Sequence, residues 1–393
     1  MAQSNFPLAL SSWGEEEIGA IHKVIESDRY SMGPFVEQFE KDFANYVGAK
    51  YCVMVNSGST SNLIAVAALF FRKENALKAG DEVIVPAVSW STTYTPLQQY
   101  GLKIKFVDVD LETLNYDLNA LESAITDKTR FIVAVNLLGN PNDFSRIEEI
   151  IGDKNILLYE DNCESLGAAF NSKKAGTFGL LGGYSTFFSH HMSTMEGGLI
   201  TTDDEELYHI MLSLRSHGWT RHLPKENHVT GTKSDVAFEE SFKFVLPGYN
   251  VRPVEMSGAI GIEQLKKLPS FIDERRKNAK YFMELFKDID HFIIQKEVGD
   301  SSWFGFSFIL KDSAPFTRAE VISHLESKGI ECRPIVAGNF AKNDVIKYFD
   351  YEIHGELKNA SIIDKRGFFV GNHHVDMKDA INYLHQTFQE LLK

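Results

Sequence analysis

The chain has 393 residues, of which 44% are hydrophobic and 24% are charged, and its formal net charge at pH 7 is −14. This length predicts one large domain and a smaller one, and the composition is that of a globular protein. The negative charge argues against nucleic-acid binding over a broad surface, although a small anionic ligand needs only a local site.

The cysteines and the apolar runs exclude further classes of protein. The three cysteines, Cys52, Cys163 and Cys332, are far apart in the sequence. Their odd number implies no disulfide framework, and most iron–sulfur clusters need four thiolates. The longest apolar run, residues 64–71, is too short to cross a bilayer, and the N-terminal residues lack the pattern of a signal peptide. We therefore expect a cytoplasmic protein with no membrane-embedded part.

Short apolar strands alternate with helices through most of the chain. Helical patterns at 15–27 and 36–46 come first. The expected strands are residues 51–55, 82–86, 103–109, 130–135, 156–159, 182–188 and 198–202, with helices such as 60–71, 118–125 and 146–151 between them. This alternation predicts a mostly parallel sheet that is covered on both faces.

A long helical pattern at 253–288 leads into the expected second domain. The strands predicted there are 304–310 and 330–334, and the helices are 318–328 and 380–392. We place the large α/β domain at residues 31–265, and the small C-terminal α+β domain at residues 266–393 together with residues 1–30.

The segment from Asn56 to Thr60 is a candidate anion site, because it ends a strand and opens a helix. The first turn of a helix offers free N–H groups and the positive end of the dipole, and Gly58 lets the backbone approach an anion closely. On the motif alone, helix capping by Ser or Thr is the commoner reason for such residues.

Two chemically useful side chains follow other expected strands. Trp90 comes after strand 82–86, where an aromatic ring can stack on a flat ligand, although packing is the commoner role of a tryptophan. Asp161 follows strand 156–159, where a buried carboxylate needs a partner. Capping of the next helix is the competing interpretation of this aspartate.

The segment from Ser185 to Gly198 carries the adjacent residues His190 and His191 on the connection between two strands. Loops at strand ends are where chemistry concentrates. No third ligand with suitable spacing is nearby in the sequence, so the pair does not indicate a metal site. An exposed pair without a role is the remaining structural interpretation.

The same segment resembles the cofactor-lysine segment of the sugar aminotransferases that use pyridoxal phosphate. In that family a Ser is followed, after four intervening residues, by a Lys and then by an acidic residue and two glycines. Ser185 and Glu196-Gly197-Gly198 keep this spacing, but His190 stands at the lysine position. The resemblance covers essentially the whole chain. It implies an aspartate-aminotransferase-like (type I) fold and the cofactor pyridoxal 5′-phosphate or pyridoxamine 5′-phosphate.

The resemblance also implies a role for each candidate residue. In the family, the cofactor phosphate is held by groups at the positions of the Gly58 and Ser59 amides and the Ser185 hydroxyl. The residue at the position of Trp90 stacks on the pyridine ring. The residue at the position of Asp161 pairs with the protonated ring nitrogen, and the one at the position of Glu164 supports the ring. Asn250 lies in a Gly-aromatic-Asn-x-Arg pattern. This pattern implies a homodimer in which Asn250 reaches the partner's cofactor phosphate, although a turn into the next helix would also explain it.

A histidine at the lysine position changes the expected reaction. An imidazole cannot form a Schiff base with the cofactor aldehyde, but it can accept and return protons. The chain therefore resembles the dehydratase members of the family, in which L-glutamate regenerates the pyridoxamine form of the cofactor. The resemblance implies that His190 is the base and that the C3 hydroxyl of a GDP-linked 4-keto-6-deoxy sugar leaves, giving a precursor of colitose in bacterial O-antigens. We expect only a supporting role for His191.

Four further residues have two interpretations of similar weight. Each could contact the sugar or the diphosphate of the substrate, or simply add surface charge: His217, Arg221, Glu331 and Arg333.

Three alternative functions remain. A sugar 4-aminotransferase would need the missing lysine to release its product. The iron–sulfur-dependent 3-dehydrase of CDP-sugars also carries histidine here, but it needs four cysteines. A non-catalytic pseudoenzyme is the third alternative, and the intact set of cofactor residues argues against it.

Overall fold

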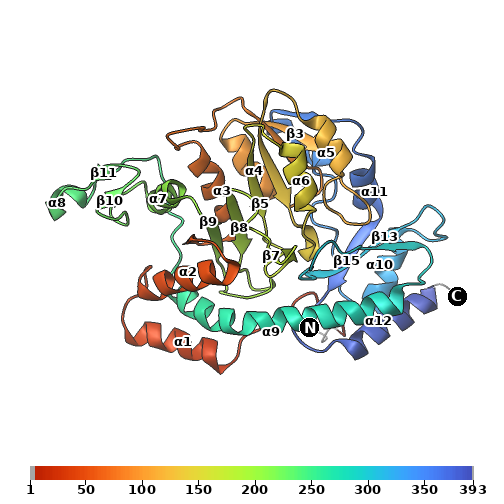
Figure 1. Cartoon of the computed structure of the whole chain (residues 1–393). Helices are drawn as coiled ribbons and strands as arrows, with labels where there is room; N and C mark the ends of the chain where they lie inside the picture. The colour runs from red at the N-terminus through yellow and green to blue at the C-terminus, as the bar shows by residue number, and fades with distance from the viewer. Residues whose placement is uncertain (1–4, 392–393) are drawn as a thin grey trace.

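The computed structural model describes residues 5–391, and an eight-stranded sheet lies at its centre (Figure 1). Its strands are β1 (Tyr51–Val55), β2 (Glu82–Pro86), β3 (Lys103–Val107), β4 (Thr129–Val135), β5 (Leu157–Asp161), β8 (Leu181–Ser185), β9 (Gly198–Thr202) and β14 (Tyr351–Ile353). Their order is β1-β9-β8-β5-β4-β2-β3-β14. Strand β9 is antiparallel to both of its neighbours, and the other pairs are parallel. The prediction of a mostly parallel sheet is confirmed.

Both faces of this sheet are buried, because successive side chains of each strand enter different hydrophobic clusters. Val83 and Val85 pack in one cluster and Ile84 in another. The helices on the first face are α3 (Gly58–Leu69), α4 (Ser91–Gln99), α7 (Glu205–Leu214) and α11 (Lys358–Arg366). Those on the second are α2 (Pro34–Val47), α5 (Leu118–Ala124), α6 (Phe144–Ile151) and the first part of α9 (Glu255–Phe286). This layering explains why the strands read as apolar runs without a polar face.

A second hydrophobic core lies around a three-stranded antiparallel sheet in the C-terminal part of the chain. Its elements are β12 (Phe292–Ile294), β13 (Gly305–Leu310), β15 (Gly367–Gly371), α10 (Arg318–Ser327) and α12 (Lys378–Leu391). Helix α9 reaches both cores, since Leu268 packs in the first and Phe282 in the second. The Phe282 and Phe306 rings stack with centroids 4.1 Å apart. The predicted domain boundary at residue 265 falls within this helix, and the boundary stays a prediction.

One predicted strand of the second domain is wrong. Within the expected strand 330–334, Ile330 and Arg333 each form only an isolated bridge, to Phe6 and Phe369 respectively. The two bridges go to different segments, and Pro334 has no N–H to donate, so no continuous ladder forms.

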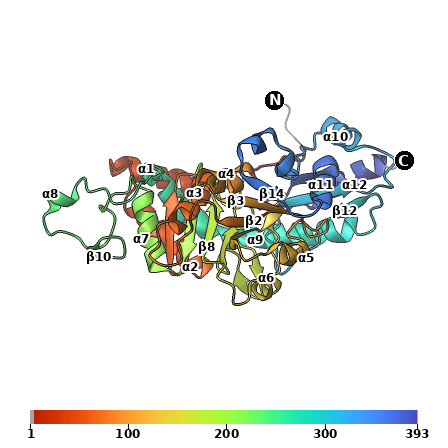
Figure 2. The same ribbon diagram turned by 90° about the horizontal axis from the view of Figure 1, so that it is seen from above.

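An arm, which we define as residues 219–245, projects from the body of the molecule (Figures 1 and 2). It contains β10 (Glu226–Asn227), β11 (Gly231–Thr232) and α8 (Ala237–Glu240). The remaining elements are α1 (Glu15–Glu26), which packs on α9, and the short pair β6 (Ala169–Phe170) and β7 (Lys173–Lys174). Among the residues described, no helix is both long and apolar enough to cross a membrane.

Candidate active site

A cavity of about 960 Å³ lies at the carboxyl ends of β1, β2, β4, β5 and β8. This is the edge of an α/β sheet at which ligands usually bind. The second domain contributes Phe304, Glu331 and Arg333 to the wall, and the N-terminal segment contributes residues 7–9. The cavity therefore joins segments from the whole length of the chain.

One end of the cavity is an anion seat at the start of α3. Ser57 caps the helix by accepting a hydrogen bond from the Thr60 N–H to its side chain, at 3.2 Å. This leaves Gly58 and Ser59 in the first turn, where N–H groups have no partner within the helix. A Cβ at Gly58 would lie 2.5 Å from the Cβ of Ser185, which also lines the cavity. Glycine thus permits the close approach of the helix start and the Ser185 hydroxyl.

The middle of the cavity offers a ring face and a carboxylate. Trp90 precedes α4 and is 59% exposed, an unusually high value for a tryptophan that lines a cavity. Asp161 is buried at the end of β5 and accepts hydrogen bonds from Asn62, Thr93 and the Cys163 N–H at 2.9, 2.8 and 3.1 Å. All three donors are neutral, so this buried carboxylate favours a cationic partner in the cavity.

Glu164 and Cys163 lie beside Asp161 and are both protonated more readily than usual. Burial raises the pKa of Glu164 to about 7, and the negative charge of Asp161 adds to this rise. The Leu138 N–H donates a hydrogen bond to the Glu164 carboxylate at 3.1 Å, which opposes the rise. Burial and the same charge raise the pKa of the Cys163 thiol well above its ordinary value. Glu164 and Cys163 therefore carry less negative charge at neutral pH than their ordinary pKa values would give.

His190 lies on the loop between β8 and β9 and lines the same cavity as Asp161. Its backbone N–H is bonded to the Phe187 carbonyl at 2.9 Å, and its ring packs edge-on against Phe304 with centroids 5.2 Å apart. Burial lowers the pKa of His190 to about 4, so the ring is neutral at pH 7. Its Nδ1 is buried without a hydrogen-bond partner among the described residues. A neutral imidazole has one unprotonated nitrogen, so this ring is able to take a proton from a bound ligand.

His191 points away from the cavity into the protein. It is 1% exposed, its Nε2 lies 3.2 Å from the Ser302 carbonyl oxygen, and its ring also packs near Phe304, with centroids 5.6 Å apart. Burial and the positive charge of Arg275 lower the pKa of His191 well below its ordinary value. The adjacent histidines thus have different environments, and only His190 lines the cavity.

The geometry agrees with the comparisons to known proteins. The sequence profile of the DegT/DnrJ/EryC1/StrS aminotransferase family matches residues 11–387. The chain belongs to this family. GDP-4-keto-6-deoxy-D-mannose 3-dehydratase of Yersinia pseudotuberculosis is 64% identical to it over 381 residues, which cover 97% of each protein.

Two solved structures of GDP-4-keto-6-deoxymannose-3-dehydratase, each 61% identical to the chain, have the same fold. One is a mutant with bound GDP-perosamine, with a TM-score of 0.97 over 97% of this chain and 99% of that one. The other contains a trapped PLP-glutamate geminal diamine, with a TM-score of 0.96 over the same shares of the two chains. The predicted aminotransferase-like α/β fold is confirmed.

The family's cofactor fits the groups that line the cavity. Pyridoxal phosphate carries a phosphate, a flat aromatic ring and a basic ring nitrogen. The start of α3 with Ser185, the exposed face of Trp90 and the carboxylate of Asp161 match these three features in turn. The family's lysine position carries His190, so the chain provides no amine there for a covalent link to the cofactor.

The structure places nine of the predicted site residues along the same cavity: Gly58, Ser59, Trp90, Asp161, Glu164, Ser185, His190, Glu331 and Arg333. Asn250, His217 and Arg221 are outside its lining in the single chain. Arg221 stacks on Trp219 of the arm at 4.4 Å, and Asn250 is exposed next to Arg252, from which it accepts a hydrogen bond at 3.1 Å. Their roles toward substrate and cofactor stay predictions.

Two partners of Asp161 were not expected from the sequence. Asn62 lies on α3, four residues after Gly58. Thr93 lies on α4, three residues after Trp90, which caps the start of that helix. One helical turn separates each pair, and this spacing was the available signal. No such signal marked Phe304, because it comes from a segment far from His190 in the chain.

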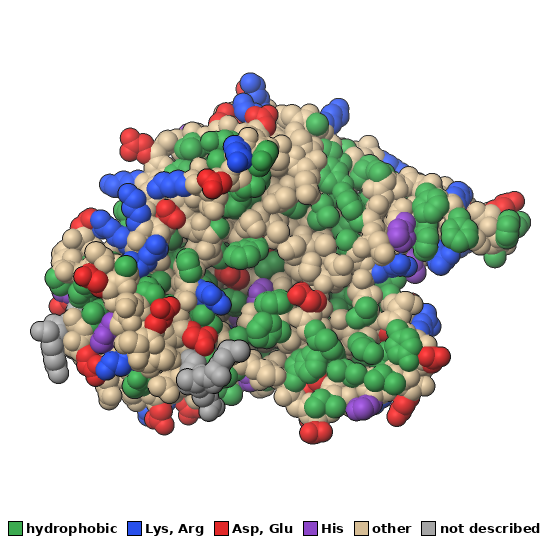
Figure 3. All heavy atoms as spheres, turned by 180° about the vertical axis from the view of Figure 1, so that it is seen from behind, with side chains coloured by type: hydrophobic (Ala, Val, Ile, Leu, Met, Phe, Trp, Pro, Cys, Tyr) green, Lys and Arg blue, Asp and Glu red, His purple; other side chains and the backbone are tan. Residues whose placement is uncertain are grey.

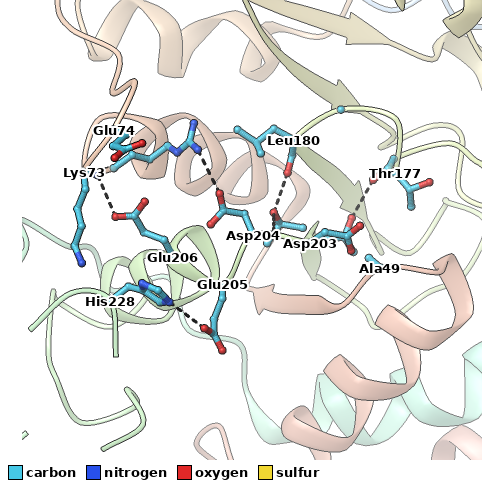
Figure 4. A pocket seen from close by; sticks show the side chains of 15 residues that line it. Ala49, Lys73, Glu74, Thr177, Leu180, Asp203, Asp204, Glu205, Glu206 and His228 are labelled. Carbon is cyan, nitrogen blue, oxygen red and sulfur yellow. Dashed lines mark hydrogen bonds and ion pairs between the residues drawn. The ribbon is translucent and has the colours of Figure 1, made fainter. Parts of the chain in front are cut away.

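A second cavity, of about 780 Å³, lies at the C-terminal end of β9 and the start of α7 (Figure 4). Its wall carries the acidic run 203–206, but these side chains already serve the fold. Asp204 caps α7 and pairs with Arg72 at 3.3 Å, and Glu205 accepts a hydrogen bond from His228 (Figure 4). Among residues 5–391 no cluster of three or more His, Cys, Asp or Glu side chains is arranged to hold a metal ion.

Proposed function

We propose that the chain is a 3-dehydratase that removes the C3 hydroxyl of GDP-4-keto-6-deoxy-D-mannose and gives GDP-4-keto-3,6-dideoxy-D-mannose. It uses pyridoxamine phosphate, which L-glutamate regenerates from pyridoxal phosphate. The observation that carries this proposal is His190, a neutral base at the family's lysine position in a cavity that otherwise keeps the cofactor residues. Relatives of that name are 61–64% identical over nearly the full chain.

The protein's first task is to hold the cofactor without a covalent link. The start of α3 and Ser185 would bind the phosphate, and Trp90 would cover one face of the ring. Asp161 would accept a hydrogen bond from the protonated ring nitrogen. When bound, pyridoxamine phosphate supplies an amine for the sugar ketone and a cationic ring that takes up electrons. Asp161 is essential to this chemistry, because its negative charge keeps the ring nitrogen protonated.

The protein's second task is proton transfer. His190 starts in the neutral form, removes a proton from the carbon next to the cofactor ring, and then gives a proton to the departing C3 hydroxyl. Phe304 and Phe187 pack against the edges of the imidazole with centroid distances of 5.2 and 5.9 Å, so its orientation is fixed before substrate arrives.

The cavity does not favour the alternative functions. A 4-aminotransferase needs a lysine amine, and no lysine is among the described residues that line the cavity. Of the three cysteines only Cys163 is in that lining, whereas a four-thiolate cluster would need all of them and one more. The intact cofactor seat argues against a pseudoenzyme.

We further propose that the enzyme is a homodimer with Asn250 and the arm of one chain at the partner's cavity. Phe238 and Phe242 of the arm are 89% and 70% exposed, and Ile18 and Ile25 of α1 are also exposed. Hydrophobic side chains gather on the arm and over the body on the face shown in Figure 3. Apolar exposure of this extent is typical of an interface. His217 and Arg221 would then serve the partner's substrate, while Glu331 and Arg333 serve their own. A cytoplasmic location stays a prediction.

Replacing His190 tests the proposed mechanism. We expect His190→Asn to bind pyridoxamine phosphate as the wild type does, while dehydration slows by roughly two to four orders of magnitude because positioned acid–base catalysis is lost. The measurements are a cofactor titration and a single-turnover assay of the sugar product. His22→Asn, on the exposed face of α1, is the matched control. Full activity of His190→Asn would contradict the assignment of the base.

A further inference from the structure

The hydrogen bonds around Asp161 form a defined network behind the cofactor seat. Its Oδ2 accepts from the Asn62 amide and the Thr93 hydroxyl, and its Oδ1 accepts from the Cys163 N–H. Asn62 and Thr93 are 2% and 3% exposed. A carboxylate has about four acceptor positions. These bonds therefore leave a position on Asp161 for one donor in the cavity.

The direction of each bond in this network follows from the number of protons available. The Thr93 hydroxyl has a single proton and gives it to Asp161 at 2.8 Å, so the Ser89 hydroxyl, 2.8 Å from Thr93, must donate to Thr93. The Tyr159 hydroxyl donates to the Asn62 carbonyl oxygen at 2.5 Å. This fixes the side-chain amide of Asn62 with its NH₂ group toward Asp161.

Asn62 also joins three elements of the fold at this point. Its NH₂ group donates to Asp161 on β5 and to the Thr92 carbonyl on α4, and Asn62 itself lies on α3. The same α3 presents the anion seat one turn earlier, and α4 follows directly on Trp90. The phosphate, face and nitrogen positions of the cofactor seat are thus linked through two buried polar side chains.

We propose that Asn62 and Thr93 are positioning residues that hold the Asp161 carboxylate in place and aimed at the ring nitrogen of the cofactor. This inference deepens the proposed function and rests on it for the identity of the cofactor. Neither side chain needs to touch the reacting atoms. Both donate to the oxygen that does not bond the Cys163 N–H, so they set the plane in which the carboxylate meets the ring. Hydrogen bonds to a charged acceptor are stronger than neutral ones and favour the ionised form.

The first test is Thr93→Val, which removes the hydroxyl without a change of shape. We expect the dissociation constant of pyridoxamine phosphate, measured by fluorescence titration of the apoprotein, to rise roughly tenfold because a charge-assisted hydrogen bond is lost. We expect Thr93→Ser to bind like the wild type, since it keeps the donor. Thr95→Val is the matched control on the same helix, because the Thr95 hydroxyl bonds to the Ser91 carbonyl and is outside the cavity lining.

The second test measures the protonation of the cofactor's ring nitrogen directly. With cofactor labelled by ¹⁵N in the pyridine ring, the wild type and Thr93→Ser should show the chemical shift of a protonated nitrogen. Thr93→Val should move the signal toward the value of an unprotonated nitrogen. The double variant Asn62→Leu/Tyr159→Phe should do the same; Tyr159 is changed as well so that its buried hydroxyl is not left without a partner. An unchanged shift and unchanged affinity in these variants would overturn the inference, as would equal losses in Thr93→Ser and Thr93→Val. A failure of the proposed function would differ, because the wild type itself would then bind no cofactor or form no dehydrated product.

Discussion

At the scale of the residue, the proposed function depends on the exchange of lysine for histidine at position 190. A lysine there would act both as base and as covalent anchor, whereas His190 can act only as base. The loop that carries it has the spacing from Ser185 to Gly198 that the resemblance requires, so the proposal places the imidazole where the amine of the aminotransferases would act. The rest of the seat must then bind the cofactor by noncovalent contacts alone.

The partly buried His190, with its lowered pKa, gives a testable dependence of stability on pH. Its pKa is about 4 in the folded protein, below the ordinary value of 6.5, so the unfolded chain binds the extra proton between these values. This contribution to stability is present above pH 6.5 and is lost as the pH falls. By linkage it costs at most about 2 kcal/mol at pH 5. We expect apoprotein His190→Asn to lose less stability than the wild type between pH 7 and pH 5 in urea unfolding.

The exposed His22 provides the reference for that experiment. His22→Asn should follow the wild-type dependence, since its side chain meets solvent in both states. Equal pH dependence in His190→Asn and the wild type would show that the ring is not buried as the structure describes.

At the scale of the element, α3 positions most of the proposed cofactor seat, because its start is the proposed phosphate site and its first turns place Asn62. We expect Gly58→Ala to raise the dissociation constant of pyridoxal phosphate at least tenfold, since a Cβ at this position would meet Ser185 at 2.5 Å and Cys163 at 3.2 Å. Gly19→Ala, in α1, is the matched control: nothing lies within 4 Å of its Cβ, and alanine should stabilise the helix by about 1 kcal/mol. Wild-type cofactor affinity in Gly58→Ala would place the phosphate elsewhere.

Elements with a strong hydrophobic period were predictable from the sequence. Strands β1, β2 and β9 have the predicted bounds, because almost all of their side chains, on both faces of the sheet, are buried. Helix α4 was missed, since its run of Ser and Thr residues, of which Thr92 and Thr93 line the cavity, resembles a loop and Pro96 interrupts it. The strand β14 was missed because it is short and lies at the sheet edge, where it pairs with β3 from far away in the sequence.

In the candidate site, too, residues marked by a local sequence pattern were predictable and contacts set by tertiary packing were not. Residues on strand ends and helix starts, such as Gly58, Asp161 and Ser185, were predicted and do line one cavity. Contacts that depend on tertiary packing, such as Phe304 on His190, could not be read from local pattern. The direction in which Asn62 points is set by Tyr159 and Thr92, neither of which is its neighbour in sequence.

At the scale of the whole molecule, mixing of subunits tests whether Asn250 acts across a dimer. His190→Asn and Asn250→Ala should each be impaired alone. A heterodimer formed from the two has one doubly defective site and one intact site, so activity should return on co-expression. If Asn250 serves its own chain, no intact site forms and activity stays low. Light scattering should give twice the chain mass of 44.4 kDa.

The most direct test of the whole account is to identify the product of the wild-type enzyme. The protein is mixed with pyridoxal phosphate, L-glutamate and GDP-4-keto-6-deoxy-D-mannose, and the sugar nucleotide is analysed by mass spectrometry. The account predicts a product one oxygen lighter than the substrate, with ammonia and 2-oxoglutarate formed in equal amounts. A 4-amino sugar, or a sugar that keeps its C3 hydroxyl, would contradict it.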